Sequence, residues 1–381
     1  MDSHRLRAVF MRGGTSKAVM FRRDDLPANP KAWDPIFLQV MGSPDPNGRQ
    51  LDGMGGGISS VSKICVIGRP SRPDADVDYT FAQIGIRDSF VDYGANCGNM
   101  SSAVGPFALE EGLVNPPADG EAVVRIHNTN TSKIIVARFP VDDGKLAATG
   151  DIEIDGVAGR AAPIRLEFLE PGGARTGKLL PTGRACDVFE IDGLGAVRAS
   201  CVDAANPCVF VEASAVEKSG DELPDVLEGD ALFLKRMEDI RCAASIAMEI
   251  AGDVEQARRM TGIPKVAMVS GPRSGRTLSG RELAASDTDI WVRMISVGQP
   301  HRAVPITGAI CLAVAARVPG SLPAALTTSA GPIRIAHPSG VTLVDARVSA
   351  AEQGLVNAEF GAVYRTARRL FEGHVIYRSP E

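Results

Sequence analysis

The residue best placed to carry out chemistry in this sequence is Cys97. It lies in a turn between an alternating apolar segment, which predicts a strand, and an apolar stretch that predicts a short buried helix over residues 103–109. Its neighbours Asn96, Gly98 and Asn99 are residue types that tolerate a sharply turned backbone. A thiol at the start of a helix is close to unpaired N–H groups, which stabilise a thiolate and hold a nearby carboxylate. This arrangement suits acid–base chemistry; the alternative is a small apolar cysteine packed at a helix start.

A second candidate is Lys63, which follows a glycine-rich loop and directly precedes an apolar strand predicted over residues 64–67. A lysine at such a junction is partly desolvated, and burial favours the neutral amine that can act as a base. The alternative is an exposed lysine at the end of a strand. The glycines at 53, 55 and 57 superficially suggest a dinucleotide-binding loop. No buried strand precedes them and no long helix pattern follows, so we do not expect one.

Near the N-terminus, residues 6–22 predict two short strands around a Gly-Gly turn. The turn presents Thr15, Ser16 and Lys17, and hydroxyl and backbone N–H groups of such a turn can bind an anion. A nucleotide-binding P-loop is not expected, because the four-residue spacer and the Gly-Lys-Ser/Thr order are missing. An anion-binding loop and a plain hairpin are therefore the two interpretations of this segment.

Length and composition bound the fold and exclude several functions. A chain of 381 residues fits two domains, and a turn-rich stretch places the boundary near residue 184, giving domains 1–184 and 185–381. The net charge of -5, with both signs interspersed, shows no basic face for nucleic acid. The 7 cysteines lack regular spacing and indicate reduced thiols. The polar N-terminus has no apolar run long enough for a signal peptide or a membrane span, so we expect a soluble cytoplasmic protein.

The second half of the sequence repeats the design of the first. Residues 299–316 predict a polar loop, a Thr-Gly turn and a short apolar helix, so each half carries one buried helix opened by a glycine turn. Such duplication suggests a cleft between two related domains, with His301, Thr307 and Gly308 as candidate contacts to a ligand. Cys311 lies within the predicted helix and is interpreted as a core residue. The 5 histidines show no paired spacing and there is no Cys-x-x-Cys motif, so we predict no metal site.

Eight motifs follow one another along the chain: Met-Arg-Gly-Gly-Thr-Ser-Lys, Gly-Ser-Pro-Asp, Gln-x-Asp-Gly-x-Gly-Gly, Ser-Ser-x-Ser-Lys, Asn-Cys-Gly-Asn, Leu-Leu-Pro-Thr-Gly, Thr-Gly-Ala-Ile-Cys and Arg-Thr-Ala-Arg-Arg. In this order they resemble the PrpF family, which includes 2-methylaconitate cis-trans isomerase, 3-methylitaconate isomerase and 4-oxalomesaconate tautomerase. The likeness extends from Met11 to Arg369. It implies an α+β chain of two similar domains with the diaminopimelate-epimerase-like fold. Each domain is then a curled mixed sheet around a central helix, with the active site in the interdomain cleft.

The resemblance also implies proton transfer without a cofactor. The wider epimerase superfamily uses two cysteines, one at each central helix; this chain keeps the first as Cys97 but has no cysteine before the turn at residues 305–308. In the isomerase branch a lysine is associated with the site, and Lys63 matches that position. Our hypothesis assigns the two proton-transfer roles to Lys63 and Cys97 and leaves open which residue acts first. The residues that we expect to bind substrate are Thr15, Ser16, Lys17, Asn96, Gly98, Asn99, Met100, His301, Thr307 and Gly308.

Three functions follow from this interpretation. The first is a cofactor-free isomerase of small unsaturated di- or tricarboxylates, with 2-methylaconitate as the preferred substrate. The second keeps the chemistry but takes 4-oxalomesaconate, an acid of aromatic-compound breakdown. The third is a non-catalytic partner of an aconitase-type dehydratase. A homodimer, and a functional link of the enzyme to such a dehydratase, are compatible with the resemblance.

Overall fold

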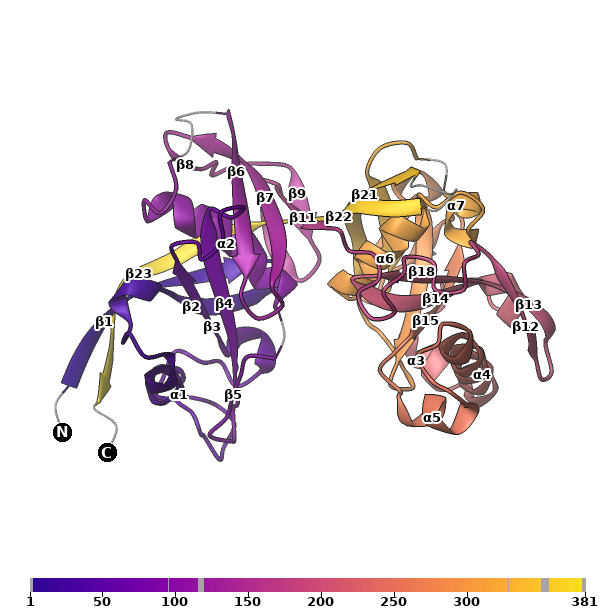
Figure 1. The fold of residues 1–381 in the computed structure, drawn as a ribbon, viewed down its shortest axis with the longest axis horizontal. Helices are drawn as coiled ribbons and strands as arrows, with labels where there is room; N and C mark the ends of the chain where they lie inside the picture. The colour runs from indigo at the N-terminus through magenta and orange to yellow at the C-terminus, as the bar shows by residue number, and fades with distance from the viewer. Residues whose placement is uncertain (1–2, 95, 116–119, 328, 351–355, 379–381) are drawn as a thin grey trace. The chain divides into compact units, whose positions relative to one another are not determined.

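The structure is a computed structural model that describes residues 3–94, 96–115, 120–327, 329–350 and 356–378. The chain forms two compact units, one made of Met1–Leu166 with Tyr364–Glu381 and the other of Glu167–Val363 (Figure 1). Within the described residues, no helix is both long enough and apolar enough to cross a membrane. Each unit combines a mixed sheet with a few helices, and this confirms the expected α+β class.

The turn-rich stretch near residue 184, where the sequence places the domain boundary, lies inside the second unit. One reason is Asp203, whose carboxylate accepts hydrogen bonds from the backbone N–H groups of Arg175 and Thr176 at 2.8 and 2.7 Å. These bonds fasten the start of the stretch to a buried strand of the second unit. The last strand of the chain instead belongs to the first unit, where it pairs with the first strand along its whole length.

The first unit contains the N-terminal half of the elements and the last strand. They are β1 (Ser3–Gly13), β2 (Ser16–Arg22), α1 (Trp33–Met41), β3 (Lys63–Gly68), β4 (Val77–Ile84), β5 (Val91–Asp92), α2 (Gly98–Glu110), β6 (Gly120–Asn128), β7 (Lys133–Asp142), β8 (Lys145–Leu146), β9 (Ile152–Ile154), β10 (Val157–Ala161) and β23 (Ala367–Arg378). β11 (Ile164–Leu169) leads into the second unit.

Helices pack on both faces of the sheet of the first unit. The apolar side of α1, including Phe37, packs with Ile64 and Val66 of β3 and Ala82 of β4. Because side chains alternate along a strand, the intervening residues of β3 and β4 face the other helix, α2. That helix is buried from Met100 to Leu109 and contacts β1, β2, β3, β6 and β7, so the sheet curls around it (Figure 1).

The second unit holds the remaining elements. They are β12 (Asp187–Ile191), β13 (Gly195–Ala204), β14 (Asn206–Glu212), α3 (Pro224–Glu228), α4 (Ala231–Ala247), α5 (Val254–Arg259), β15 (Lys265–Ser270), β16 (Gly275–Arg276), β17 (Glu282–Leu283), β18 (Ile290–Ser296), β19 (Gln299–Pro300), α6 (Ile306–Ala315), α7 (Leu322–Leu326), β20 (Ile333–His337) and β21 (Gly340–Ala350). β22 (Val356–Arg365) leads back to the first unit.

The two sheets have the same order of parallel and antiparallel neighbours. In the first unit β23, β1 and β2 are antiparallel neighbours, β2 and β3 are parallel, β3 and β4 antiparallel, β4 and β6 parallel, and β6 and β7 antiparallel. The strands β12, β13, β14, β15, β18, β20 and β21 repeat that order in the second unit. In this correspondence α6 is the counterpart of α2 and α4 that of α1. The expected duplication, with one central helix in each half, is confirmed.

Candidate active site

Cys97 is the N-cap residue of α2. Its backbone is extended, with φ -101° and ψ 98°, and its carbonyl accepts the first helical bond from the N–H of Ser101 at 3.0 Å. The thiol is free and half-buried, and no side chain caps the N–H groups of the first turn. Those groups belong to Gly98, Asn99 and Met100, so an anion at this helix end meets unpaired donors and the positive end of the helix dipole.

Lys63 is the first residue of β3 and is buried, with 7% of its surface exposed. Its ammonium Nζ donates a hydrogen bond of 2.5 Å to Oε1 of Gln83 and lies 5.1 Å from the ring centre of Phe81. The amide nitrogen of Gln83 donates to the carbonyls of Ser59 and Ser62 at 3.1 and 2.9 Å. These two bonds orient the Gln83 amide so that its oxygen faces Lys63. The loop before β3 therefore positions Lys63 through Gln83.

Lys63 and Cys97 lie on the same side of the sheet, next to Cys65. Burial raises the pKa of the Cys65 thiol well above its usual range; a negative charge on Cys97 raises it further, and the charge of Lys63 lowers it. The Cys65 thiol donates to the hydroxyl of Tyr79 at 3.8 Å, and burial also raises the pKa of Tyr79. Cys65 and Tyr79 therefore stay protonated and form an uncharged floor beside Lys63 and Cys97.

An asparagine network holds the turn before Cys97. Ser101 Oγ and Asn128 Nδ2 donate to Oδ1 of Asn96 at 3.3 and 3.4 Å. Asn130 exchanges hydrogen bonds with the backbone of Phe81 at 2.8 and 2.9 Å. Asn96, expected to bind substrate, thus has its carbonyl oxygen engaged within the protein. Asn128 and Asn130 were not predicted from the sequence; their signal is the polar Asn-Thr-Asn run that begins at the last residue of the alternating strand β6.

The hairpin turn between β1 and β2 packs against the start of α2. Asn99 Nδ2 donates to Oγ1 of Thr15 at 3.1 Å. A Cβ atom on Gly14, whose φ is +51°, would lie 2.2 Å from the Asn99 side chain, so this position requires glycine. Arg12 ties the turn to the end of the chain, because its guanidinium donates to the carbonyls of Gly14 and Thr366, both at 2.9 Å. Thr15 and Asn99, both predicted to bind substrate, therefore lie next to each other.

Lys17 does not join them. In the hairpin register Lys17 is paired with Arg12, and its Nζ lies 5.6 Å from the ring centre of Phe10. Phe10 packs against the core on the α1 face. Ser16, one residue earlier, is on the α2 face and is buried. The strand alternation thus directs Lys17 away from the face that carries Cys97.

A glycine-rich loop leads to Lys63 and is folded around Gln50. The buried Gln50 side chain accepts hydrogen bonds from the N–H of Gly57 at 2.9 Å and from Ser62 Oγ at 2.6 Å, and it donates to Ser43 Oγ at 2.8 Å. Asp45 lies in the same loop, and hydrogen bonds from backbone N–H groups, chiefly that of Asn47, lower the pKa of its carboxylate. The glycines thus allow close packing around an amide, and a short 3-10 turn, not a long helix, follows them.

In the second unit, α6 begins after Pro305. Thr307 is exposed, and a Cβ atom on Gly308 would lie 2.5 Å from the sulfur of Met294, so Gly308 permits the helix to approach β18. His301 Nε2 is hydrogen-bonded to Ser296 Oγ at 2.6 Å. Cys311 lies in the core, where its thiol donates to a backbone carbonyl at 3.3 Å and burial raises its pKa.

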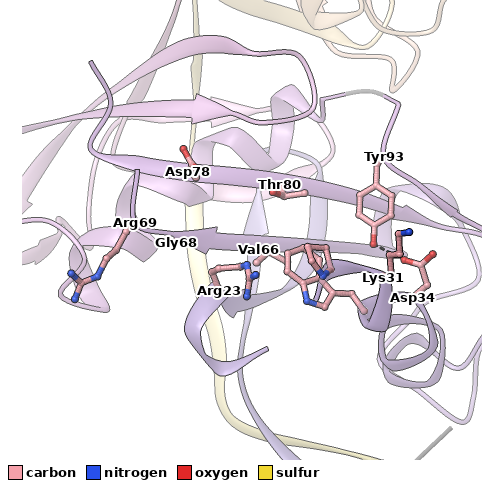
Figure 2. Close-up of a pocket in the computed structure, with 11 residues that line it drawn as sticks. Arg23, Lys31, Asp34, Val66, Gly68, Arg69, Asp78, Thr80 and Tyr93 are labelled. Carbon is pink, nitrogen blue, oxygen red and sulfur yellow. Dashed lines mark hydrogen bonds between the residues drawn. The ribbon is translucent and has the colours of Figure 1, made fainter. Parts of the chain in front are cut away.

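Figure 2 shows a groove of about 500 Å³ in the first unit that is separate from this arrangement. It is lined by Val66 and Thr80, which alternate with Cys65 and Tyr79 and therefore face the opposite side of the sheet. Several of its polar side chains bind other groups of the protein: the hydroxyl of Tyr93 donates to Asp34 at 2.7 Å, and Arg23 stacks on Trp33 and donates to two backbone carbonyls. The other lining residues are Pro30, Lys31, Gly68, Arg69 and Asp78.

One experiment tests whether Gln83 positions Lys63. The change of Gln83 to Glu places a carboxylate beside the ammonium, and this ion pair holds the proton on Lys63. If Lys63 is the base, kcat falls about tenfold or more and recovers at higher pH; if Lys63 is the acid, kcat falls without that recovery. The measurement is a pH profile of kcat for Gln83→Glu and for the uncharged control Gln83→Met. An unchanged profile in Gln83→Glu contradicts a role for Gln83.

Comparison with known proteins identifies relatives over the whole chain. The family described as PrpF protein matches residues 3–378. The 3-methylitaconate isomerase of Eubacterium barkeri is 41% identical, covering 98% of this chain and 97% of its own length. The 2-methyl-aconitate isomerase of Cupriavidus necator is 39% identical (97% and 96%), and the 4-oxalomesaconate tautomerase of Pseudomonas putida is 39% identical (98% and 97%). A solved structure of methylitaconate-delta-isomerase superposes with a TM-score of 0.90 at 40% identity, covering 99% of this chain and 96% of that one.

Proposed function

The chain belongs to the PrpF family and is an isomerase, and on that premise we propose that it isomerises an unsaturated di- or tricarboxylate by proton transfer without a cofactor. The preferred substrate is 2-methylaconitate. The observation that carries the proposal is the pair Lys63 and Cys97 beside Cys65 and Tyr79, two groups that burial keeps uncharged. An acid–base pair beside two uncharged groups suits abstraction of a proton from carbon, because neither Cys65 nor Tyr79 adds a negative charge that would oppose the developing carbanion.

The reaction needs only proton transfer and stabilisation of negative charge. A substrate of this class carries a C–H bond next to a conjugated double bond. The base takes that proton, and the electrons of the C–H bond form a dienolate with the carboxylate. Rotation about the former double bond followed by return of a proton gives the cis-trans isomer, whereas protonation at another carbon shifts the double bond. Lys63 and Cys97 are the two groups that we assign to removal and return of the proton.

Lys63 has a neutral hydrogen-bond partner, which suits this role. The carbonyl oxygen of Gln83 accepts its hydrogen bond at 2.5 Å, whereas a carboxylate partner would stabilise the ammonium much more strongly. The aromatic face of Phe81 completes the surroundings of the amine. We assign one proton transfer to Lys63 and the other to Cys97 and leave open which residue acts first.

The substrate carboxylates require hydrogen-bond donors. In the first unit we assign this role to the N–H groups of Gly98, Asn99 and Met100 at the start of α2, with Thr15 held next to them by Asn99. These donors also stabilise the dienolate, whose negative charge spreads onto a carboxylate. From the second unit we propose His301, Thr307 and Gly308 as further contacts.

A competing assignment takes 4-oxalomesaconate as substrate, and it is supported by a tautomerase relative at the same 39% identity as the 2-methyl-aconitate isomerase. Proton NMR with each acid in separate assays distinguishes the two. We expect conversion of 2-methylaconitate with kcat/KM at least about tenfold higher than for 4-oxalomesaconate. A reversed preference transfers the assignment to the tautomerase reaction. Absence of conversion and of deuterium uptake from solvent with both acids contradicts an isomerase of these substrates and favours a binding partner of an aconitase-type dehydratase.

We also propose that the protein is a homodimer joined through β23. This strand pairs only with β1 among the strands that the structure describes, and Leu370, Phe371 and Ile376 are 42%, 51% and 68% exposed. The side chain of Gln39 donates to the backbone carbonyl of Arg378 and accepts from its N–H, so these two backbone groups point away from β1. In an antiparallel ladder every second residue does the same, so alternate residues of β23 direct their backbone groups outward. Long exposed edge strands of this kind pair with other strands. A functional link to an aconitase-type dehydratase stays a prediction.

The dimer proposal predicts the effect of one proline. Counting back from Arg378 in steps of two, His374 is another residue of β23 whose backbone N–H points away from β1. A proline at this position therefore removes a donor from the outer edge of β23 and breaks no hydrogen bond to β1. We expect His374→Pro to weaken the dimer at least about tenfold. The measurement is sedimentation of His374→Pro and of the control His374→Ala. A monomeric wild type, or a dimer unaffected by the proline, contradicts this interface.

A further inference from the structure

The second unit has a lysine at the position that Lys63 occupies in the first. Lys63 begins β3 and is paired with Ala18 at the start of the parallel ladder between β2 and β3. Lys265 begins β15 and is paired with Cys208 at the start of the corresponding ladder between β14 and β15. Since the strand order of the two units is the same, Lys265 is the internal counterpart of Lys63.

Lys265 faces the central helix of its unit, as Lys63 does. Val266 and Ile295 belong to the core beneath α4, so the alternating residues Lys265 and Ser296 point to the α6 side of the sheet. The register that pairs Val266 with Ile295 places Lys265 opposite Ser296 one step further along. Ser296 therefore occupies the position that Gln83 has in the first unit.

The partner at this position is used differently in the two units. In the first unit Gln83 accepts a hydrogen bond from Lys63. In the second, Ser296 Oγ is hydrogen-bonded at 2.6 Å to Nε2 of His301. The ammonium of Lys265 has no hydrogen bond or ion pair with any residue that the structure describes, although the residue is half-buried. An ammonium that is half-buried and has no partner on the described part of the protein is available to bind an anion.

Two further features support an anion at this place. Burial lowers the pKa of Lys265, and burial followed by the charge of Lys265 lowers the pKa of His301. The two side chains are therefore close enough to interact, and His301 is held as a neutral imidazole beside a cation. The N-cap of α6 is Pro305, whereas the N-cap of α2 is Cys97. The second unit thus keeps the lysine but has no thiol at the N-cap of its central helix.

We propose that Lys265, with His301 beside it, binds a carboxylate group of the substrate. The two equivalent lysines then have different roles. Lys63 transfers a proton together with Cys97, whereas Lys265 binds a carboxylate through its positive charge. This inference rests on the proposed function for the identity of the anion as an unsaturated di- or tricarboxylate. It also predicts that substrates with a second or third carboxylate bind better than their monocarboxylate analogues.

The test compares three lysine variants. Lys265→Met removes the charge at similar size, Lys265→Arg retains it, and Lys235→Met removes an exposed α4 lysine that is paired with Asp239 at 2.8 Å. We expect Lys265→Met to raise KM at least about tenfold with a much smaller change in kcat, because a positioning charge contributes mainly to binding. We expect Lys265→Arg to restore most of the affinity and Lys235→Met to match the wild type.

A binding measurement separates this inference from the proposed reaction. Isothermal titration calorimetry with tricarballylate, a saturated tricarboxylate that cannot isomerise, reports the anion site without turnover. Wild-type binding that weakens at least about tenfold in Lys265→Met, and recovers in Lys265→Arg, supports the inference even if no acid is isomerised. Wild-type binding that is absent, or equal in Lys265→Met, overturns it. Isomerisation with an unchanged KM in Lys265→Met also overturns it while leaving the proposed function intact.

Discussion

Replacing Lys63 with alanine is expected to lower kcat about a hundredfold to ten-thousandfold, the range typical of losing a general acid or base. The side chain is buried, its amine has a single neutral hydrogen-bond acceptor in Gln83, and it lies on the same face of the sheet as Cys97. Lys17 cannot replace it, since its side chain points to the opposite face of the sheet. The measurement is steady-state isomerisation of 2-methylaconitate followed by proton NMR.

Three controls separate loss of the proton-transfer group from loss of charge. Lys63→Arg keeps a cation that does not release its proton near neutrality, so we expect it to be nearly as inactive as Lys63→Ala. Small primary amines added to Lys63→Ala should restore part of the rate, more strongly as their basicity increases. Lys31→Ala removes an exposed lysine from the groove on the other face and should retain wild-type activity. Full activity in Lys63→Arg would show that only the charge matters.

Replacing Cys97 with serine is expected to cause a loss of kcat of about a hundredfold to ten-thousandfold. A hydroxyl group is a far weaker acid than a thiol, so serine keeps the shape of the turn but not its ability to exchange a proton. The side-chain hydrogen bonds among Asn96, Asn128 and Ser101 do not involve the sulfur, so the variant should fold normally. The comparison is with Cys186→Ser, which changes a half-buried cysteine of the second unit.

Alkylation provides an independent measure of the same thiol. Five of the seven cysteines are buried, and Cys97 and Cys186 are half-buried. We expect iodoacetamide to modify Cys97, to inactivate the enzyme in proportion, and to be slowed by substrate. Mass spectrometry locates the label, and Cys186→Ser removes the competing site. Full activity of a protein labelled completely at Cys97 contradicts the assignment.

The local part of this site was predictable from sequence because local signals determine it. Cys97 precedes an apolar stretch with glycine and asparagine neighbours, and the structure begins α2 directly after it. Lys63 stands between a polar loop and an apolar run, and the structure makes it the first residue of β3. In both cases the change in hydrophobic pattern marks the end of an element, so the place of the residue along its element can be predicted from its neighbours in sequence.

The partners of these residues depend on distant strands and could not be predicted in the same way. Gln83 meets Lys63 because β3 and β4 pair in a particular register, and Asn130 meets Phe81 across a separation of 49 residues. Lys17 was grouped with Thr15 and Ser16 from its place in the turn, but the hairpin register directs its side chain to the α1 face. A register shifted by one residue would have directed it to the α2 face. The residue types of Gln83, Asn130 and Lys17 do not indicate how the strands that carry them pair with their neighbours.

The extent of the two units has a similar explanation. The sequence places a boundary where glycine and proline accumulate, but Asp203 binds the start of that stretch through side-chain hydrogen bonds that only the folded strand β13 provides. The pairing of β23 with β1 joins the two ends of the chain, with Arg378 opposite Ser3. Contacts between residues so far apart in sequence leave no periodic signal within either strand.

The measurement that tests the central claim most directly is proton NMR of 2-methylaconitate in deuterated buffer with the wild type, Lys63→Ala and Cys97→Ser. The two-residue account predicts that the wild type incorporates solvent deuterium as it isomerises the substrate, and that each variant loses both isomerisation and exchange by about a hundredfold or more. Isomerisation by the wild type with wild-type rates of exchange in either variant would contradict the assignment of proton transfer to Lys63 and Cys97.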